Sequence, residues 1–273
     1  MPELPEVETT IRGLKSIVGS TIINIKIHTP KLRFFIPKNI QKIKNHTKII
    51  NIKRIGKFIL INLSEQDTMV LHLGMSGRLR LYSLEKFHKQ KHDHFILKTN
   101  NNKFLVFNDA RRFGFVDFDK TYLIHNRKYI LNLGIDALDK KLTANMLFSK
   151  ISNTMVPIKQ ILLNQRIISG IGNIYASEIL FDAKISPLQQ GKDISLFKCR
   201  KIVISTRKIL SKAIKKGGSS LRDYVSVDGE LGNFQNNFKV YNREGEKISG
   251  KNIKKIVQYG RSTYYCPELQ IIN

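Results

Sequence analysis

The amino-acid sequence predicts an α+β protein in which an N-terminal helix and a β-sandwich precede a helical domain. Three observations favour this fold class. Apolar residues first recur at helical spacing, at Val7, Ile11, Leu14 and Val18. From Thr21 to about Asp119 the apolar period falls to two, which is typical of strands with one buried face. Beyond about residue 133 the helical period returns.

The first helix is predicted over residues 5–18. Two prolines and three glutamates fall in or just before its first turn, where they suit a helix N-terminus, and Gly19 stands where a helix is expected to stop. Six alternating segments then predict strands, at 23–27, 50–52, 58–63, 69–73, 95–97 and 104–107. The Asn-rich stretch 100–102 predicts a turn between the last two.

Four helices are expected in the second half, over 143–152, 157–163, 173–183 and 193–216. Thr143 is placed to cap the first of them, and Gly217-Gly218 ends the last. A polar loop over 219–236 follows. The remainder alternates like a short hairpin, which predicts that Phe238–Val240 pairs with the region of Val257 and Tyr264.

Charge is the strongest compositional signal. The 273 residues carry 47 Lys and Arg against 21 Asp and Glu, a formal charge of +26. A genome rich in Lys, Ile and Asn codons is the plainer explanation, but such bias rarely leaves so large an excess of one sign. We therefore expect a polyanionic partner, and nucleic acid first.

Cysteine usage and the chain start indicate a cytoplasmic protein. Only Cys199 and Cys266 are present, far apart, so no disulfide framework is indicated. The first residues lack the basic and apolar regions of a signal peptide. No uninterrupted apolar run approaches the roughly 18 residues that a membrane span requires. We expect no membrane partner.

The amino terminus carries candidate chemistry. If Met1 is trimmed, the chain begins with the secondary amine of Pro2, and an α-amino group has an ordinary pKa of about 8, so part of it is neutral and nucleophilic. Glu3 follows with a carboxyl that can protonate a sugar ring oxygen. Proline at position two and glutamates in a first turn are also ordinary, and on this segment alone the ordinary interpretation is preferred.

Seven separated blocks change that balance, at 1–9, 56–58, 72–77, 91–94, 109–114, 170–178 and 260–263. In this order they resemble the formamidopyrimidine-DNA glycosylases over almost the whole chain. The resemblance implies a catalytic β-sandwich domain over 1–132, a helix-two-turn-helix DNA-binding domain over 133–218, and a lesion loop with a zinc-finger-like β-hairpin over 219–273. Residues 217–224 resemble the mobile loop that closes over the damaged base in this family, although their polarity would equally suit a plain linker.

The resemblance also assigns catalytic roles. Pro2 would be the Schiff-base nucleophile and Glu3 the acid. Lys57 would shuttle a proton in β-elimination of the 3′ phosphate, and Arg261 would assist δ-elimination. Without the resemblance, Lys57 is one solvated lysine among many.

A glycosylase must flip its target nucleotide out of the stack and fill the gap. The resemblance assigns the filling to Met75, Arg111 and Phe113, although Met75 and Phe113 would also suit a core. It makes His92, Lys159 and Asn173 contacts to DNA.

Two neighbouring features invite other interpretations. His92 and His94 would point the same way from a strand, but no further ligand lies at metal spacing, so we expect no metal there. The glycines of 169–173 precede a helix, where a phosphate can reach free N–H groups. Tyr175 stands where a dinucleotide-binding motif needs its third glycine, so we expect a DNA phosphate instead.

The chain departs from the family at its terminal hairpin, where four cysteines usually hold zinc. Only Cys266 remains: Leu269 stands at the last ligand position, and 246–250 replaces the first pair and is shorter by about two residues. We expect the structural zinc to be lost and no cofactor to be required. The hairpin then either folds on apolar contacts of Phe238, Val240, Ile256, Val257 and Tyr264, or is loose and leaves Arg261 poorly placed.

The sequence therefore predicts a monomeric DNA glycosylase and abasic-site lyase of base excision repair. It would remove 8-oxoguanine and formamidopyrimidines from damaged duplex DNA and leave a one-nucleotide gap. Two alternatives stay open. One is the related enzyme that acts on oxidised pyrimidines, which Leu4 and the Arg111 block disfavour. The other is a catalytically idle nucleic-acid-binding protein, which the joint presence of Pro2, Glu3 and Lys57 disfavours.

Overall fold

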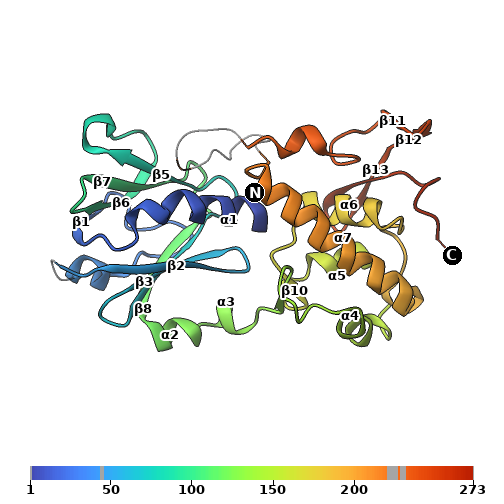
Figure 1. Ribbon diagram of the computed structural model, residues 1–273, viewed down its shortest axis with the longest axis horizontal. Helices are drawn as coiled ribbons and strands as arrows, with labels where there is room; N and C mark the ends of the chain where they lie inside the picture. Colours follow the sequence, from blue (N-terminus) through green and yellow to red (C-terminus); the bar gives the residue numbers. More distant parts are fainter. Residues whose placement is uncertain (1, 44–45, 220–226, 228–231, 273) are drawn as a thin grey trace. The chain divides into compact units, whose positions relative to one another are not determined.

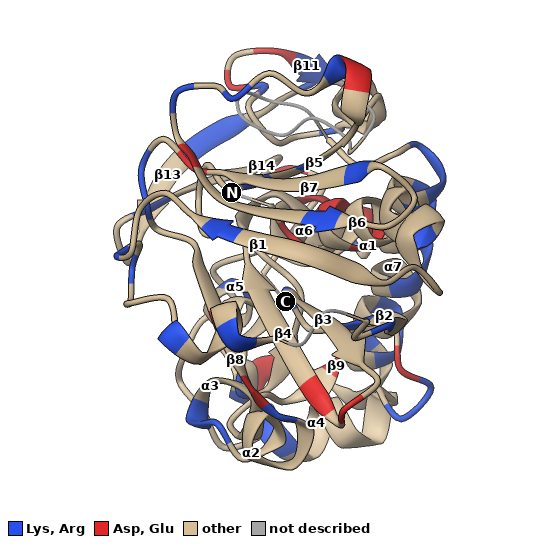
Figure 2. Ribbon diagram, turned by 90° about the vertical axis from the view of Figure 1, so that its left-hand side faces the viewer, with Lys and Arg blue, Asp and Glu red and all other residues tan. Residues whose placement is uncertain are grey.

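The computed structural model describes residues 2–43, 46–219, 227 and 232–272 (Figure 1). They form two compact units, each described by itself below. The sandwich unit comprises Met1–Leu131 and Lys216–Gln235, and the helical unit comprises Asn132–Lys215 and Asn236–Asn273. Lys and Arg residues occur in both units (Figure 2). Among the described residues, none of the helices is long and apolar enough to cross a membrane.

The sandwich unit begins with the helix α1, Leu4–Gly13, which tightens into the 3₁₀ turn η1, Leu14–Ile17. The predicted helix 5–18 is thus shorter as an α-helix. A Cβ on Gly13 would lie 2.8 Å from the Val227 Cβ, so the glycine permits a close approach at the point where the helix changes type. Leu14 and Ile17 stay fully buried, whereas Val18 is exposed.

Two four-stranded antiparallel sheets follow, and they confirm the predicted β-sandwich (Figure 1). One has the order β1 (Ile22–Ile27), β6 (Asp93–Thr99), β7 (Lys103–Asn108), β5 (Arg78–Ser83). The other has the order β2 (Ile49–Ile55), β3 (Phe58–Leu63), β4 (Asp67–His72), β8 (Phe115–Lys120). The periodicity did not single out β5 and β8. Two short helices, α2 (Thr121–His125) and α3 (Lys128–Leu131), close the unit and were not predicted.

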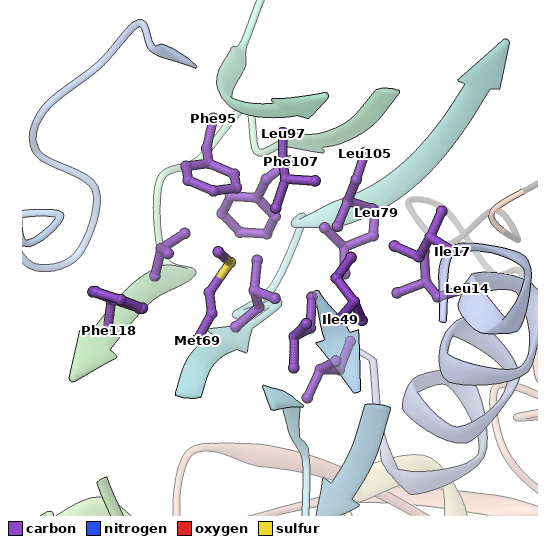
Figure 3. Packing of buried hydrophobic residues seen from close by; sticks show 14 of the residues in the cluster. Leu14, Ile17, Ile49, Met69, Leu79, Phe95, Leu97, Leu105, Phe107 and Phe118 are labelled. Carbon is purple, nitrogen blue, oxygen red and sulfur yellow. The ribbon is translucent and has the colours of Figure 1, made fainter. Parts of the chain in front are cut away.

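The sandwich core lies between the two sheets and under the apolar face of α1 and η1 (Figure 3). Alternate residues of each strand reach it, as the period of two predicts. Phe95 and Leu97 of β6 meet Met69 of β4 in one cluster that also holds Leu14 and Ile17. A rigid core of this kind fixes the strand ends from which the functional loops depart.

The helical unit contains the four predicted helices, α4 (Ala144–Ile151), α5 (Ile158–Leu163), α6 (Asn173–Asp182) and α7 (Leu196–Lys215). The Thr143 side chain accepts from the Met146 N–H at 3.2 Å, which confirms the predicted cap. A short parallel pair that was not predicted, β9 (Ile135–Asp136) with β10 (Ile168–Ser169), also belongs to this unit.

Two hairpins complete the helical unit: β11 (Lys247–Ile248) with β12 (Lys251–Asn252), and β13 (Lys254–Gln258) with β14 (Arg261–Tyr265). The predicted strand at Phe238–Val240 was wrong. The backbone N–H groups of Lys239, Val240 and Tyr241 all donate to the carboxylate of Glu178, at 2.9–3.0 Å. Because this carboxylate takes the N–H groups that a ladder would need, the segment stays irregular.

Candidate active site and nucleic-acid interface

The amino terminus is held by a reciprocal pair of hydrogen bonds. Pro2 is buried, and Glu3, 2% exposed, is the N-cap of α1. The Glu3 carboxylate accepts from the Glu6 N–H, and the Glu6 carboxylate accepts from the Glu3 N–H at 2.9 Å. The arrangement fixes the two residues on which the predicted chemistry depends, side by side at a helix start.

Glu6 has a second partner far along the chain. Its other oxygen accepts from the backbone N–H and the hydroxyl of Ser219, at 2.8 and 2.9 Å. Gly217 and Gly218, both at positive φ, bring Ser219 to this carboxylate. The first residues of the predicted lesion loop are therefore tied to the N-terminal helix; residues 220–224 of that loop lie outside the described residues.

Lys57 lies in the two-residue turn between β2 and β3, beside Gly56 at φ 56°. It is 8% exposed, not the solvated lysine that the sequence alone would suggest. Arg54 ties this turn to α1, because its Nε donates to Glu8 at 3.0 Å while its Nη1 donates to the Gly56 carbonyl at 3.0 Å. Arg54 and Glu8 thus connect the Lys57 turn to the Pro2 helix, a role that the sequence analysis missed.

His72, at the end of β4, is kept neutral. Burial, together with the positive charges of Lys57 and Arg33, lowers its pKa to about 4. Its Nδ1 accepts from the Gly74 N–H at 3.2 Å, so the neutral ring carries its proton on Nε2. The ring stacks on Phe115 with centroids 5.5 Å apart. These interactions place Lys57, Arg33 and His72 in one positively charged neighbourhood.

Two loops of the sandwich unit present exposed apolar tips. Met75, between β4 and β5, is 37% exposed, and Phe113, between β7 and β8, is 45% exposed. The Arg111 guanidinium lies 4.9 Å from the centre of the Phe113 ring. The alternative that these apolar residues belong to the core does not fit such exposure. We call residues 74–77 and 110–114 the wedge loops.

The wedge loops touch each other through backbone. Gly74 has φ 59°, and a Cβ there would lie 2.4 Å from the Gly114 nitrogen and 2.4 Å from the Phe113 carbonyl carbon. A Cβ on Gly114 would in turn meet the His72 oxygen at 2.6 Å. Glycine is therefore required at both positions by close approach, in addition to the φ at Gly74.

Asp109, fully buried, joins the two wedge loops. Its carboxylate accepts from the Ser76 hydroxyl at 2.5 Å and from the Gly114 N–H at 2.8 Å. Ser76 in turn accepts from the Arg111 N–H at 3.1 Å. Asp109 lies in the block 109–114, but no role was predicted for it; a carboxylate between two glycine-containing loops is the signal that could have found it.

The two histidines differ from the expectation that both would point the same way from a strand. His92 precedes β6, with φ 72°, and is half-buried. His94 is buried in β6, where its Nε2 donates to the Asp109 carbonyl and its Nδ1 meets the Thr29 hydroxyl, both at 2.8 Å. His94 is thus a structural residue, because both its ring nitrogens are satisfied within the protein.

The helical unit brings together the other predicted residues. Arg261 is exposed at the start of β14, after the turn of Tyr259 and Gly260, both at positive φ. Lys159 is fully buried, and its ammonium donates to the Ser262 carbonyl at 3.0 Å and the Thr263 hydroxyl at 2.6 Å.

Asn173 at the start of α6 donates to the same Ser262 carbonyl, at 2.9 Å. Its Oδ1 is buried without a hydrogen-bond partner among the residues described. Gly172 is the N-cap of α6, and Gly170 lies at φ 103°. Lys159 and Asn173 therefore reach the strand that carries Arg261. A direct contact with DNA, as predicted, would require the Lys159 ammonium to face solvent. The ammonium instead faces the hairpin.

The residues at the predicted zinc position do not fit the metal. Cys266 is buried and supplies one sulfur, the Leu269 side chain offers no donor atom, and residues 246–250 contain no cysteine. Among the described residues, no three His, Cys, Asp or Glu side chains are grouped to hold a metal ion. Other contacts hold the hairpins: the Lys251–Glu268 ion pair at 2.8 Å, and a cluster of Val240, Ile253 and Tyr264 packed by Phe181, Tyr241 and Ile248. Ile253 and Tyr241 were not among the apolar contacts expected.

Comparisons with known proteins agree with this arrangement. Residues 1–116 match the formamidopyrimidine-DNA glycosylase N-terminal domain, and residues 133–225 match the H2TH domain of that family. Proteins named formamidopyrimidine-DNA glycosylase are similar to this chain over 99% of its length and 100% of their own. The one from Zymomonas mobilis is 42% identical over 272 residues, and the one from Wolbachia pipientis is 41% identical over 277.

Solved structures of the Lactococcus lactis protein named FPG are also similar. A variant in complex with DNA containing Fapy-dG has a TM-score of 0.90 and 33% identity, covering 98% of this chain and 99% of that chain. The complex with abasic-site DNA has a TM-score of 0.89 with the same identity and coverage. Fold and relatives together define a DNA glycosylase of DNA repair. In particular, the chain belongs to the formamidopyrimidine-DNA glycosylase family.

Proposed function

We propose that this protein is a bifunctional glycosylase and abasic-site lyase that excises oxidised purines from duplex DNA through an imine at Pro2. The observation that supports the proposal is the N-terminal arrangement, in which reciprocal hydrogen bonds between Glu3 and Glu6 hold the backbone and the carboxyl of Glu3, the residue that follows Pro2. Once Met1 is removed, that nitrogen is a secondary amine with an accessible neutral form.

The proposed steps use groups of this chain. The neutral Pro2 nitrogen forms a bond to C1′ as the glycosidic bond breaks and its electron pair leaves with the base, and the N–H proton of Pro2 passes through solvent to the departing base. Glu3 gives a proton to the ring oxygen, the sugar opens and an iminium forms. Lys57 then moves a proton from C2′, and the 3′ phosphate leaves with the electron pair of its C–O bond. Water finally hydrolyses the imine and frees the amine.

In this proposal the second elimination, which releases the 5′ phosphate, is assisted by Arg261 at the tip of the β13–β14 hairpin. Lys159 and Asn173 act through this hairpin, since both donate to the Ser262 carbonyl next to Arg261. Asn173 and His92 remain candidate contacts to DNA phosphates.

Base flipping is assigned to the wedge loops. Met75 and Phe113 supply exposed apolar tips, and Arg111 beside Phe113 supplies donors for the base left without a partner. The net charge of +26 favours binding to the phosphate backbone, with affinity that falls steeply with salt. We further propose that the protein acts as a monomer in the cytoplasm, without zinc in its finger and without a cofactor.

The test is borohydride trapping on a duplex with one 8-oxoguanine opposite cytosine. We expect a covalent adduct, base loss and strand cleavage, and mass spectrometry should show that Met1 is absent. Pro2→Gly should lower adduct formation at least about 100-fold. Pro5→Ala, in the same helix turn, is the matched control and should keep the adduct.

Each control separates one alternative. An undamaged duplex should give no adduct, and a duplex with an oxidised pyrimidine should react more slowly than the 8-oxoguanine duplex. A faster reaction there would favour the pyrimidine-specific relative. Binding of the damaged duplex with neither adduct nor cleavage would overturn the proposal in favour of an idle binding protein.

A further inference from the structure

A cavity of about 270 Å³ opens on the outer face of the sheet β1-β6-β7-β5, on the side opposite the sandwich core. Strand alternation explains its position. Ile25, Leu97 and Leu105 point into the core, so their neighbours Lys26, Lys98 and Phe104 line the opposite face. None of the groups that line it has a part in the proposed glycosylase chemistry.

One wall of the cavity is aromatic. Phe87 follows the short 3₁₀ turn η3, Leu84–Lys86, and stacks on Phe104 of β7, with ring centroids 4.5 Å apart and planes 10° from parallel. Tyr82 lies beside Phe87, with centroids 6.0 Å apart. Both phenylalanines are only half-buried, so they present apolar surface that the fold itself does not cover.

The rest of the lining is cationic. Lys26 and Lys89 are exposed and Lys98 is half-buried, with the Lys98 ammonium 5.6 Å from the Phe104 ring centre. Among the residues that the structure describes, none of these three lysines forms an ion pair with a carboxylate. Figure 2 shows Lys and Arg on both β1 and β6.

His28, also in the lining, reports the local charge. Burial lowers its pKa, the positive charges of Lys89 and Lys26 lower the pKa further, and Asp93 raises it. Asp93 supplies one negative charge against these lysines, and its carboxylate oxygens accept from the Gln90 N–H at 2.7 Å and from the Asn108 side chain at 2.8 Å. The mouth of the cavity therefore concentrates positive charge.

A flat apolar wall and three ammonium groups select a ligand that has both an aromatic face and an anionic group. An inorganic anion would leave the phenylalanines without a partner, and a neutral aromatic compound would leave the lysines without one. We propose that this pocket binds a nucleoside phosphate, with the base against Phe87 and Phe104 and the phosphate among Lys26, Lys89 and Lys98. The nucleotide is either free or one unit of a single strand.

The test compares two variants of equal charge. Lys26→Glu/Lys89→Glu reverses two exposed lysines of the pocket, and Lys15→Glu/Lys48→Glu reverses two exposed lysines elsewhere in the sandwich unit. Binding of ADP is measured by calorimetry at low salt. Binding of labelled (dT)₈ is measured by anisotropy with excess unlabelled abasic-analogue duplex present.

We expect the pocket variant to lose at least about tenfold in affinity for one or both probes, while the control variant changes less than about twofold. Phe87→Ala should also weaken binding. Loss for ADP identifies free nucleotides as ligands, and loss for (dT)₈ alone identifies single strands. An equal loss in both charge variants, no binding of either probe, or full affinity in Phe87→Ala would overturn the proposal.

The glycosylase reaction is an independent readout. Cleavage of the 8-oxoguanine duplex should stay within about twofold of wild type in the pocket variant, because its two lysines belong to neither the wedge loops nor the amino terminus. Failure of the pocket proposal would therefore leave the imine mechanism standing, and the reverse also holds.

Discussion

The wedge loops of the sandwich unit and the β13–β14 hairpin of the helical unit both present exposed functional side chains, yet they are held by buried groups of opposite charge. Under the wedge loops lies the Asp109 carboxylate, which accepts from Ser76 and Gly114. Under the hairpin lies the Lys159 ammonium, which donates to Ser262 and Thr263.

The difference follows from which backbone groups turn inward. The wedge loops direct an N–H group at their support, so an acceptor is required, whereas the hairpin directs a carbonyl, so a donor is required. Glu178 repeats the first case, because three N–H groups converge on it. The sign of a buried charge beneath an exposed functional loop thus indicates whether the N–H groups or the carbonyls of that loop point inward.

The largest expected effect comes from removing the carboxylate. Asp109→Ala leaves the Gly114 N–H and the Ser76 hydroxyl without their acceptor, so we expect the free energy of unfolding to fall by about 3 kcal/mol in urea titrations. Cleavage of lesion duplex should fall roughly 100-fold, because both wedge loops lose their position. Glu65→Ala, an exposed carboxylate of the same unit, should cost less than about 0.5 kcal/mol. Equal stability of the two variants would refute the role of Asp109.

The neutral His72 ring also supports the wedge loops, and the pH dependence of the free energy of unfolding tests this role. The folded-state pKa of His72, about 4, lies below the ordinary 6.5, so the unfolded chain takes up the proton first. Stability from this group is therefore full above pH 6.5 and is lost as pH falls toward 4, by at most about 3 kcal/mol. His72→Asn keeps an acceptor for the Gly74 N–H but does not titrate. Urea unfolding across this range should show a shallower pH dependence in the variant; parallel curves would contradict the assignment.

The smallest change in the free energy of unfolding is expected when the Lys159 ammonium is removed. Lys159→Met keeps the side-chain length and removes the donor, and we expect a loss of about 1–2 kcal/mol in the free energy of unfolding. Under the proposed function, the fraction of δ-elimination product should fall while base excision continues, because Arg261 alone loses its support. Lys201→Met on the exposed face of α7 serves as control. An unchanged product ratio in Lys159→Met would separate Lys159 from Arg261.

Local pattern accounts for most of the fold. The strand β3 and the helix α7 were predicted because a run such as Phe58–Leu63 and the stripe of α7 record burial directly in the sequence. The irregular segment at Phe238–Val240 was not, since the group that prevents it from forming a strand is Glu178, about sixty residues earlier.

The candidate site divides in the same way. The exposure of Met75 and Phe113 has a local signal, because each has a glycine as its neighbour in the sequence, Gly74 and Gly114. The partners of Lys159 and Glu6 are 104 and 213 residues away, so no window of sequence records them. The resemblance implied that Lys159 contacts DNA and could not show that its ammonium faces the hairpin.

The contact between Gly74 and Gly114 has a mechanical consequence. Where two loops meet backbone to backbone, with no side chain between them, one loop has little room to shift toward the other. We therefore expect Met75 and Phe113 to move as a unit rather than independently. Under the proposed function, both side chains would insert at the same base step. Insertion would then succeed more readily at a step whose stacking is weakened by damage than at an intact step.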